Sequence, residues 1–245
     1  MLPIRDINPT RTTPVVNYLL IVANVAAFVW MKSLPPWYEP GYGLVPTRIA
    51  LDPLGESFTV LTSMFMHANV AHLVGNLWFL WIFGDNVEDA LGHGRYLGFY
   101  LGGGIIAAIV QVATNLSAPV PMVGASGAIA AVTGAYLVLY PRAPILIVNP
   151  VPLLWLVMGL TLVVPAWVVV GEFFVMNLLM GVQTLHGQAN GEVAHGGIAV
   201  FAHLGGFIAG LLAIRPLSRG RARDRSRAAR SWEGWRPPPG GRYRY

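Results

Sequence analysis

The stretch Val123-Gly124-Ala125-Ser126-Gly127 places a serine between small residues at the start of a long apolar run. A serine in such a run is often a packing residue, because its hydroxyl can bond back to a carbonyl of its own helix. A catalytic serine instead needs a base within hydrogen-bonding distance. The role of Ser126 therefore depends on which polar side chains the fold brings opposite to it.

The composition is that of a membrane protein with several spans. Of the 245 residues, 55% are hydrophobic and 11% are charged, and the mean hydropathy is +0.56. A soluble domain usually carries about 25% charged residues. The net charge of +5 does not indicate nucleic-acid binding, because ten of the 16 basic residues lie between Arg215 and Arg244. The absence of cysteine excludes disulfides, thiolate metal sites and a cysteine nucleophile.

Six apolar runs have the length that a transmembrane helix needs. A further segment, 144–164, is apolar enough to span but carries three prolines near one end. The runs cover residues 14–31, 58–83, 96–114, 124–140, 166–182 and 197–214. Between them we expect a folded, membrane-hugging insertion at 32–58, a short acidic turn at 84–94 and a glycine-rich polar loop at 183–196.

The flanking charges predict that both termini are cytoplasmic. Basic residues favour the cytoplasmic side of a membrane, and the C-terminal tail, Arg5 and Arg11 all carry positive charge. Two termini on one side require an even number of spans, so 144–164 is predicted not to cross. The expected organisation is a cytoplasmic segment at 1–13, one six-span domain at 14–214 and a basic cytoplasmic tail at 215–245, disordered or bound to the membrane surface.

Polar side chains gather at one depth in this topology. The second, fourth and sixth runs all cross from outside to inside, and His72, Ser126 and His203 each lie near the start of their run. Ionisable residues within spans are costly and are functional candidates by default. Asn76 lies one turn after His72 on the same helix face, and His67 lies nearer the outer end of that run. The coincidence of depth predicts a shared site near the outer surface.

Small residues favour close contact between the fourth and sixth runs. A small residue at every fourth position lets the backbones of two helices approach each other in lipid. Contact of this kind would bring Ser126 and His203 within hydrogen-bonding distance. The spacing is that of Ser126, Ala130 and Gly134 in one run and of Ala202, Gly206 and Gly210 in the other.

Together these motifs resemble the rhomboid family of intramembrane serine proteases. The resemblance covers the chain from the first apolar run to Ile214, and it implies an all-α, polytopic bundle of six transmembrane helices. It rests on GASG at 124–127, HxxxxHxxxN at 67–76, AHLGG at 202–206, and on Gly84, Glu88 and Gly92.

The resemblance also implies the roles of the site residues. Ser126 and His203 would form a catalytic dyad without a third carboxylate. His72 and Asn76 would form an oxyanion hole with the backbone N–H of Ser126. The chemistry is consistent with these roles, since a serine hydroxyl becomes a useful nucleophile when a base accepts its proton, and donors preorganised around the oxyanion lower the barrier.

Three residues are expected to support the site. Gly124 makes room for backbone donors near the oxyanion, and Gly127 makes room for the neighbouring helix. His67 either supports the site or contacts the oxyanion directly, and both interpretations stay open. Ala130 departs from the family pattern, in which an aromatic residue often follows the serine by one turn. We expect Phe207 or an aromatic side chain of a neighbouring helix to support the histidine ring instead.

Partners and location follow from the same resemblance. The substrates would be transmembrane helices with helix-destabilising or small residues near the membrane surface. We expect a multi-pass protein of a bacterial inner membrane, with anionic lipid bound by the basic tail. No nucleic acid, cofactor or metal ion is expected, and the sequence indicates no particular oligomeric state.

Other functions stay open at this point. A catalytically silent rhomboid-like protein would bind and escort transmembrane helices with the same fold. A transporter would line a path across the membrane with polar residues, but here those residues cluster at one depth. A zinc site formed by His67, His72 and His203 is a further alternative, although the sequence lacks an HExxH motif.

Overall fold

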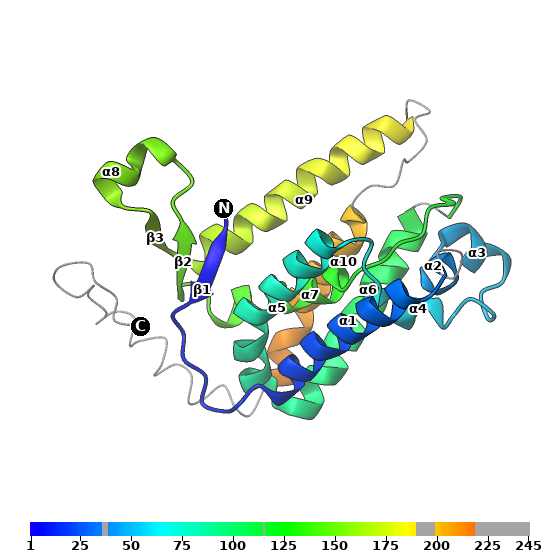
Figure 1. The fold of residues 1–245 in the computed structure, drawn as a ribbon, viewed down its shortest axis with the longest axis horizontal. Coiled ribbons are helices and arrows are strands. Elements are labelled where there is room, and N and C mark those ends of the chain that lie inside the picture. Colours follow the sequence, from blue (N-terminus) through cyan, green and yellow to red (C-terminus); the bar gives the residue numbers. More distant parts are fainter. Residues whose placement is uncertain (36–38, 115, 190–198, 219–245) are drawn as a thin grey trace.

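Six long helices dominate the fold, and each overlaps with one of the six apolar runs. The computed structural model describes residues 1–35, 39–114, 116–189 and 199–218. Within these ranges the chain is mostly helical, with a small sheet at one end of the helices and a group of short helices at the other (Figure 1). The long helices are α1 (Val15–Ser33), α5 (Val70–Leu91), α6 (His93–Thr114), α7 (Ser126–Leu139), α9 (Ala166–Ala189) and α10 (Val200–Ser218).

Four of these helices, α1, α6, α9 and α10, are long and apolar enough to cross a membrane. The chain is therefore a helical membrane protein. Helix α7 is apolar but has only 14 residues, fewer than the about 20 that a bilayer crossing takes. Helix α5 has 22 residues and carries three acidic side chains in its second half. Helices α5, α6, α9 and α10 pack around α7, so that every residue from Gly127 to Tyr136 is buried.

The second apolar run is not one continuous helix. Its first part forms α4 (Thr59–Thr62) and the single 3₁₀ turn η2 (Ser63–Phe65). The chain is then extended at Met66 and at Asn69, where the backbone ψ angles are 144° and 171°. Helix α5 begins after Asn69, whose side chain accepts a hydrogen bond of 2.8 Å from the backbone N–H of His72. An asparagine at this position is a strong N-cap, and it fixes where the helix that carries His72 starts.

The acidic turn expected at 84–94 was wrong, because α5 continues to Leu91 and ends at Gly92, where φ is 80°. The buried carboxylate of Glu88 accepts hydrogen bonds from the backbone N–H groups of Val16 and Asn17, at 3.0 and 2.7 Å. These N–H groups lie in the first turn of α1 and have no acceptor in their own helix. A negative charge at the start of a helix also interacts favourably with the helix dipole. Glu88 thus joins the start of α1 to α5.

Segment 144–164 forms no membrane-crossing helix, as predicted. It contains the strands β2 (Pro144–Val148) and β3 (Thr161–Pro165), with η3 (Pro152–Leu154) and α8 (Trp155–Met158) between them. The two strands pair antiparallel, with Ile145 opposite Val164. The N-terminal segment adds a third strand, β1 (Pro3–Asp6), which pairs antiparallel with β2, so that the sheet order is β1-β2-β3.

The N-terminal segment, residues 1–13, packs against the helices. The Oδ2 atom of Asp6 accepts hydrogen bonds from the hydroxyl of Tyr136 at 2.9 Å and the amide of Asn86 at 2.8 Å. Burial, together with the nearby Asp85, raises the pKa of Asp6 to about 8. The indole N–H of Trp78 donates to the carbonyl of Pro3 at 2.6 Å. These contacts hold the segment against α5 and the C-terminal half of α7.

The insertion at 32–58 is folded, as expected, and it holds the segment that precedes Ser126. It contains α2 (Glu39–Tyr42) and α3 (Pro46–Leu51). Leu44 is fully buried and forms a two-residue antiparallel bridge with Met122, with N–H···O distances of 3.0 and 2.7 Å. The backbone leading to the serine is therefore supported from outside the helical core.

Helices α7 and α10 pack with their backbones in contact, as the small-residue spacing predicted. A Cβ atom placed on Gly206 would overlap with the carbonyl oxygen of Gly127, and one placed on Gly210 would overlap with the carbonyl oxygen of Ala131. Likewise, a Cβ atom placed on Gly134 of α7 would overlap with the carbonyl oxygen of Phe207 of α10. Glycine is required at these positions because any side chain would push the two helices apart.

The last two helices differ from their predicted bounds. Helix α9 continues to Ala189, so the loop expected at 183–196 is wrong for residues 183–189, and the rest of that loop lies outside the described residues. Helix α10 begins at Val200 and continues to Ser218, four residues beyond the predicted end of the span. The basic tail beyond Ser218 also lies outside the described residues.

Candidate active site

Ser126 is the first residue of α7 and lies against His203 of α10. The Nε2 atom of His203 is 2.6 Å from the Oγ atom of Ser126. The turn before the serine needs Gly124, whose φ of +126° is strained for any residue with a side chain. The N–H of Gly124 donates to the carbonyl of Ser63 at 2.9 Å. The serine hydroxyl and the imidazole are thus within the distance that a nucleophile and its base require.

The first turn of α10 is anchored from α6. His203 lies one turn into α10, because the helix begins at Val200. The side-chain oxygen of Gln111 accepts a hydrogen bond of 3.0 Å from the backbone N–H of Ala202. N–H groups at a helix start have no acceptor in their own helix, so this contact stabilises the turn that carries the histidine. Gly206, one turn later, sets the close approach to α7.

The second ring nitrogen of His203 contacts a residue that the sequence analysis missed. Its Nδ1 atom lies 2.6 Å from Oδ1 of Asn177, which is on α9 and buried. Phe173, one turn earlier on α9, has its ring centroid 6.0 Å from that of His203. The aromatic ring next to the histidine therefore comes from α9. Phe207, the other residue considered for this role, stacks on Phe174 instead.

His72 and Asn76 lie beside the backbone that leads to Ser126. A Cβ atom placed on Gly124 would be 2.8 Å from Nε2 of His72 and 3.5 Å from Nδ2 of Asn76. Asn76 is buried, and among the described residues no group accepts a hydrogen bond from its Nδ2 atom. An unpaired buried amide is costly. A donor without a partner beside the serine is what an oxyanion site offers before substrate binds.

His67 precedes α5 and lies against His72. Its ring centroid is 5.2 Å from that of His72, with the planes at 71°. Its Nδ1 atom lies 3.3 Å from the carbonyl oxygen of Phe65. The geometry thus links His67 to the site through His72. Of the remaining histidines, His93 contacts Glu88 through Nδ1, His186 is exposed near the end of α9, and His195 lies outside the described residues.

Gly127 faces α6 and α10 at the point where the three helices meet. A Cβ atom placed on it would lie 2.6 Å from Cβ of Ala107 and 3.7 Å from Cβ of Ala202. The residue after the serine therefore has no room for a side chain. This close approach keeps the first turn of α7 in contact with α6.

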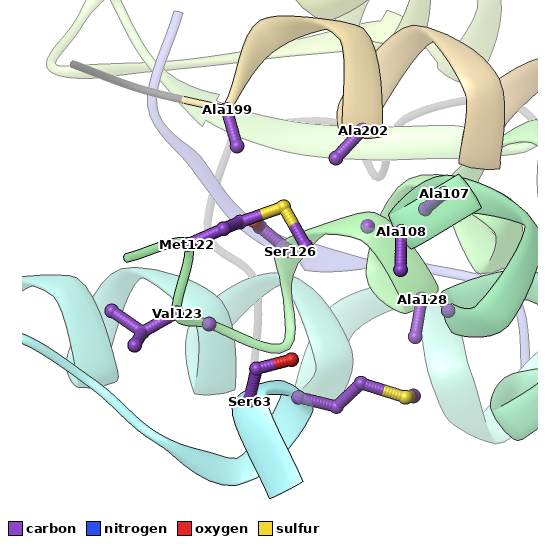
Figure 2. Close-up of a pocket in the computed structure, with 13 residues that line it drawn as sticks. Ser63, Ala107, Ala108, Met122, Val123, Ser126, Ala128, Ala199 and Ala202 are labelled. Carbon is purple, nitrogen blue, oxygen red and sulfur yellow. The ribbon is translucent and has the colours of Figure 1, made fainter. Parts of the chain in front are cut away.

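A pocket opens beside Ser126, and small side chains line most of it (Figure 2). Ala199 and Ala202, from the start of α10, face it on one side, and Ser63 lies on the opposite side. Alanines leave space for only a small apolar group next to the serine. The pocket is lined by Ser63, Met64, Gly104, Ala107, Ala108, Met122, Val123, Gly124, Ser126, Gly127, Ala128, Ala199 and Ala202.

Comparison with known proteins gives matches over most of the helical region. Residues 54–220 match the family described as Rhomboid domain. Rhomboid protease GluP of Bacillus subtilis is 42% identical over 83 residues, which are 34% of this chain and 16% of that protein. Presenilin-associated rhomboid-like protein A, mitochondrial, of Danio rerio is 35% identical over 91 residues, 36% of this chain and 24% of that protein. Rhomboid protein 1, mitochondrial, of Saccharomyces cerevisiae is 30% identical over 141 residues, 55% of this chain and 40% of that protein. The match thus spans less than half the length of each of these three relatives.

Proposed function

The chain belongs to the rhomboid family, and from this premise we propose that it is an intramembrane serine endopeptidase. It hydrolyses peptide bonds in or near the transmembrane helices of membrane-protein substrates. The observation that carries the proposal is the distance of 2.6 Å between Nε2 of His203 and Oγ of Ser126. Two helices far apart in sequence bring a hydroxyl and an imidazole together in a setting where each polar group is costly.

The reaction follows from this pair. Oγ of Ser126 attacks the carbonyl carbon of the scissile peptide bond while Nε2 of His203 takes the hydroxyl proton. The imidazolium then gives that proton to the leaving amine nitrogen, and an acyl-enzyme forms on Ser126. Water attacks the ester with His203 again acting as base, which releases the carboxylic acid product and restores the serine. Both ring nitrogens of His203 are engaged, by Ser126 and Asn177, which argues against its use as a zinc ligand.

The oxyanion hole comprises Asn76, His72 and the backbone N–H of Ser126. That N–H belongs to the first residue of α7, so it has no acceptor within its own helix. The free amide of Asn76 and the ring of His72 flank Gly124, the residue two positions before the serine. Negative charge that develops on the substrate oxygen would meet three donors there.

Replacing Asn76 by alanine should lower kcat about 100- to 1,000-fold, since one oxyanion donor is worth about 2.7–4 kcal/mol. KM should change little, because the donor acts mainly in the transition state. The measurement is cleavage of a purified single-span substrate in detergent. Val74→Ala on the exposed face of α5 is the matched control and should keep the wild-type rate. An unchanged rate in Asn76→Ala would remove this residue from the oxyanion hole.

The short α7 indicates how deep the serine lies. Its 14 residues extend about 21 Å at about 1.5 Å per residue, whereas the hydrocarbon core is about 30 Å thick. With the C-terminal end of α7 at the inner surface, Ser126 lies about 9 Å below the outer surface. That depth fits cleavage near the end of a transmembrane helix, and the alanine-lined pocket fits a small substrate side chain at the cleaved bond.

The proposed topology has six spans, in which α5 and α7 cross the membrane together with the four helices that are long and apolar enough to span it. The positive charge of the basic tail and of the N-terminal arginines supports a cytoplasmic location for both termini. Helices α5, α7 and α10 then start at the outer side, which is where His72, Ser126 and His203 lie. The setting proposed is a bacterial inner membrane, with anionic lipid around the basic tail.

A fluorophosphonate probe tests the proposal most sharply, because it modifies an activated serine and leaves an ordinary one unmodified. Purified protein should be labelled at Ser126, as identified by mass spectrometry of the modified peptide, and labelling should block cleavage of a single-span substrate. Ser126→Ala should take up no probe. A protein that binds transmembrane helices without labelling or cleavage would instead be a silent escort of membrane proteins.

A further inference from the structure

A side chain of α9 that is not part of the Ser126–His203 dyad also contacts His203. We propose that Asn177 is a positioning residue, which fixes the tautomer and the ring orientation of His203 so that Nε2 faces Ser126 as an acceptor. The inference rests on the proposed function, because it assigns Asn177 a role in the same reaction. It starts from the distance of 2.6 Å between Nδ1 of His203 and Oδ1 of Asn177, both of them buried side chains.

The hydrogen bonds of Asn177 determine which way its amide points. Its Nδ2 atom donates to the carbonyl oxygen of Phe173, one turn earlier on α9, at 2.8 Å. The reverse orientation would place two acceptor oxygens in contact at that distance, which is unfavourable. The Oδ1 atom must therefore face His203, where it accepts a hydrogen bond from Nδ1–H.

The hydrogen bond to Asn177 determines which ring nitrogen of His203 carries the proton. A neutral imidazole has one donor and one acceptor nitrogen, and a hydrogen bond at one nitrogen decides the state of the other. With Nδ1 donating to Asn177, Nε2 carries no proton and can accept the one on Oγ of Ser126. The opposite tautomer would present an N–H to the serine and would be inactive as a base.

An amide suits this position better than a carboxylate would. The imidazolium that forms during the reaction keeps its Nδ1–H bond to the amide oxygen, which carries partial negative charge. A carboxylate within a membrane span costs several kcal/mol unless it is paired or reaches water. A neutral acceptor thus orients the ring without placing a permanent charge beside it.

The same face of α9 makes a second contact with the ring. Phe173 and Asn177 are four residues apart, so they lie one turn apart on one face, and Phe173 packs against His203 with ring centroids 6.0 Å apart. Gly181, four residues further, approaches α10 as well, since a Cβ atom there would lie 3.4 Å from the side chain of Leu204. Figure 1 shows α9 running along one side of the helical bundle. The alignment of the histidine therefore depends on how α9 docks against α10.

Asn177→Leu tests the proposal, because leucine keeps the approximate volume and removes the acceptor. We expect kcat for a single-span substrate to fall about 10- to 100-fold, as a misaligned base does, with KM within about twofold of wild type. Asn177→Asp restores an oxygen that accepts from Nδ1 in either ionisation state. It should cleave at least about ten times faster than Asn177→Leu. Leu178→Ala, on the exposed face of the same helix, is the control and should match wild type.

A spectroscopic measurement separates orientation from mere packing. Solid-state NMR of protein labelled with ¹⁵N-histidine should show the Nδ1–H tautomer for His203 in the wild type. In Asn177→Leu the signal should move toward the Nε2–H tautomer, while Leu178→Ala keeps the wild-type signal. Folding of each variant is checked by its thermal unfolding in detergent.

Two results would overturn the inference while the proposed function stands. One is wild-type turnover by Asn177→Leu, and the other is an Asn177→Asp variant that is no faster than Asn177→Leu. Failure of the proposed function would look different, because wild type and Ser126→Ala would then behave alike toward both the substrate and the fluorophosphonate probe.

Discussion

Replacing His203 by alanine should reduce cleavage of a single-span substrate by about 10⁴-fold or more, and Ser126→Ala should do the same. In the proposed mechanism the imidazole accepts the hydroxyl proton, since Nε2 lies 2.6 Å from Oγ, and its removal leaves the serine a weak nucleophile. The double variant should be no slower than either single one, since residues that act as a unit lose their effect together. The measurement is initial rate with purified protein reconstituted into liposomes.

The control for this prediction is another histidine. His186 is exposed near the end of α9, and His186→Ala should retain the wild-type rate. If His203→Ala kept more than a few per cent of the activity and His186→Ala lost it, the base would lie on the far end of α9 and the assignment would be wrong. Additive losses in the double variant would likewise show that Ser126 and His203 act in separate steps.

The sequence could predict that His72, Ser126 and His203 lie close together, because this follows from the proposed six-span topology. Hydropathy defined six runs, the charges at the termini required an even number of crossings, and the prolines marked 144–164 as the segment to exclude. Three polar residues at the starts of three parallel helices then had to lie at one depth. Contact between Ser126 and His203 needed one more feature, the small residues at every fourth position, which the structure shows as backbone contact between α7 and α10.

The expectations that failed depended on partners distant in sequence. The acidic residues after Gly84 suggested a turn, but α5 continues through them to Leu91, and the buried Glu88 accepts hydrogen bonds from two N–H groups of α1. Strand β1 has no strong local pattern, and it forms because β2 offers it an edge. Neither contact can be inferred from residues near it in the chain.

Asn177 is a different kind of omission. An amide within an apolar run is a functional candidate by the same rule that selected His72 and His203, so the signal was present in the sequence. What the sequence does not give is the rotation of α9 about its own axis. That rotation decides whether Asn177 faces His203 or the lipid, and it also makes Phe173 the aromatic neighbour of the histidine ring.

Gly206→Val should lower the rate of cleavage about 100-fold, although residue 206 takes no part in the chemistry. A Cβ atom at this position would overlap with the carbonyl oxygen of Gly127, the residue next to Ser126. The obstacle is backbone, so the helices themselves must separate, and His203 lies one turn before Gly206 on the face that would move. Overpacking of this kind costs about 1–3 kcal/mol of stability, and a shift of about 1 Å between nucleophile and base costs about 100-fold in rate.

The glycines of α6 supply the control for this experiment. Gly98 and Gly102 have open space where a Cβ atom would lie, so Gly98→Val should leave cleavage and thermal unfolding close to wild type. Gly206→Val should lower both, and Gly206→Ala should do so to a smaller extent because its side chain is smaller. Fluorophosphonate labelling should fall in parallel with cleavage, since both need His203 to reach the serine hydroxyl. A Gly206→Val protein with the wild-type melting temperature and rate would mean that α7 and α10 are not in backbone contact, and the positions of Ser126 and His203 would then need another explanation.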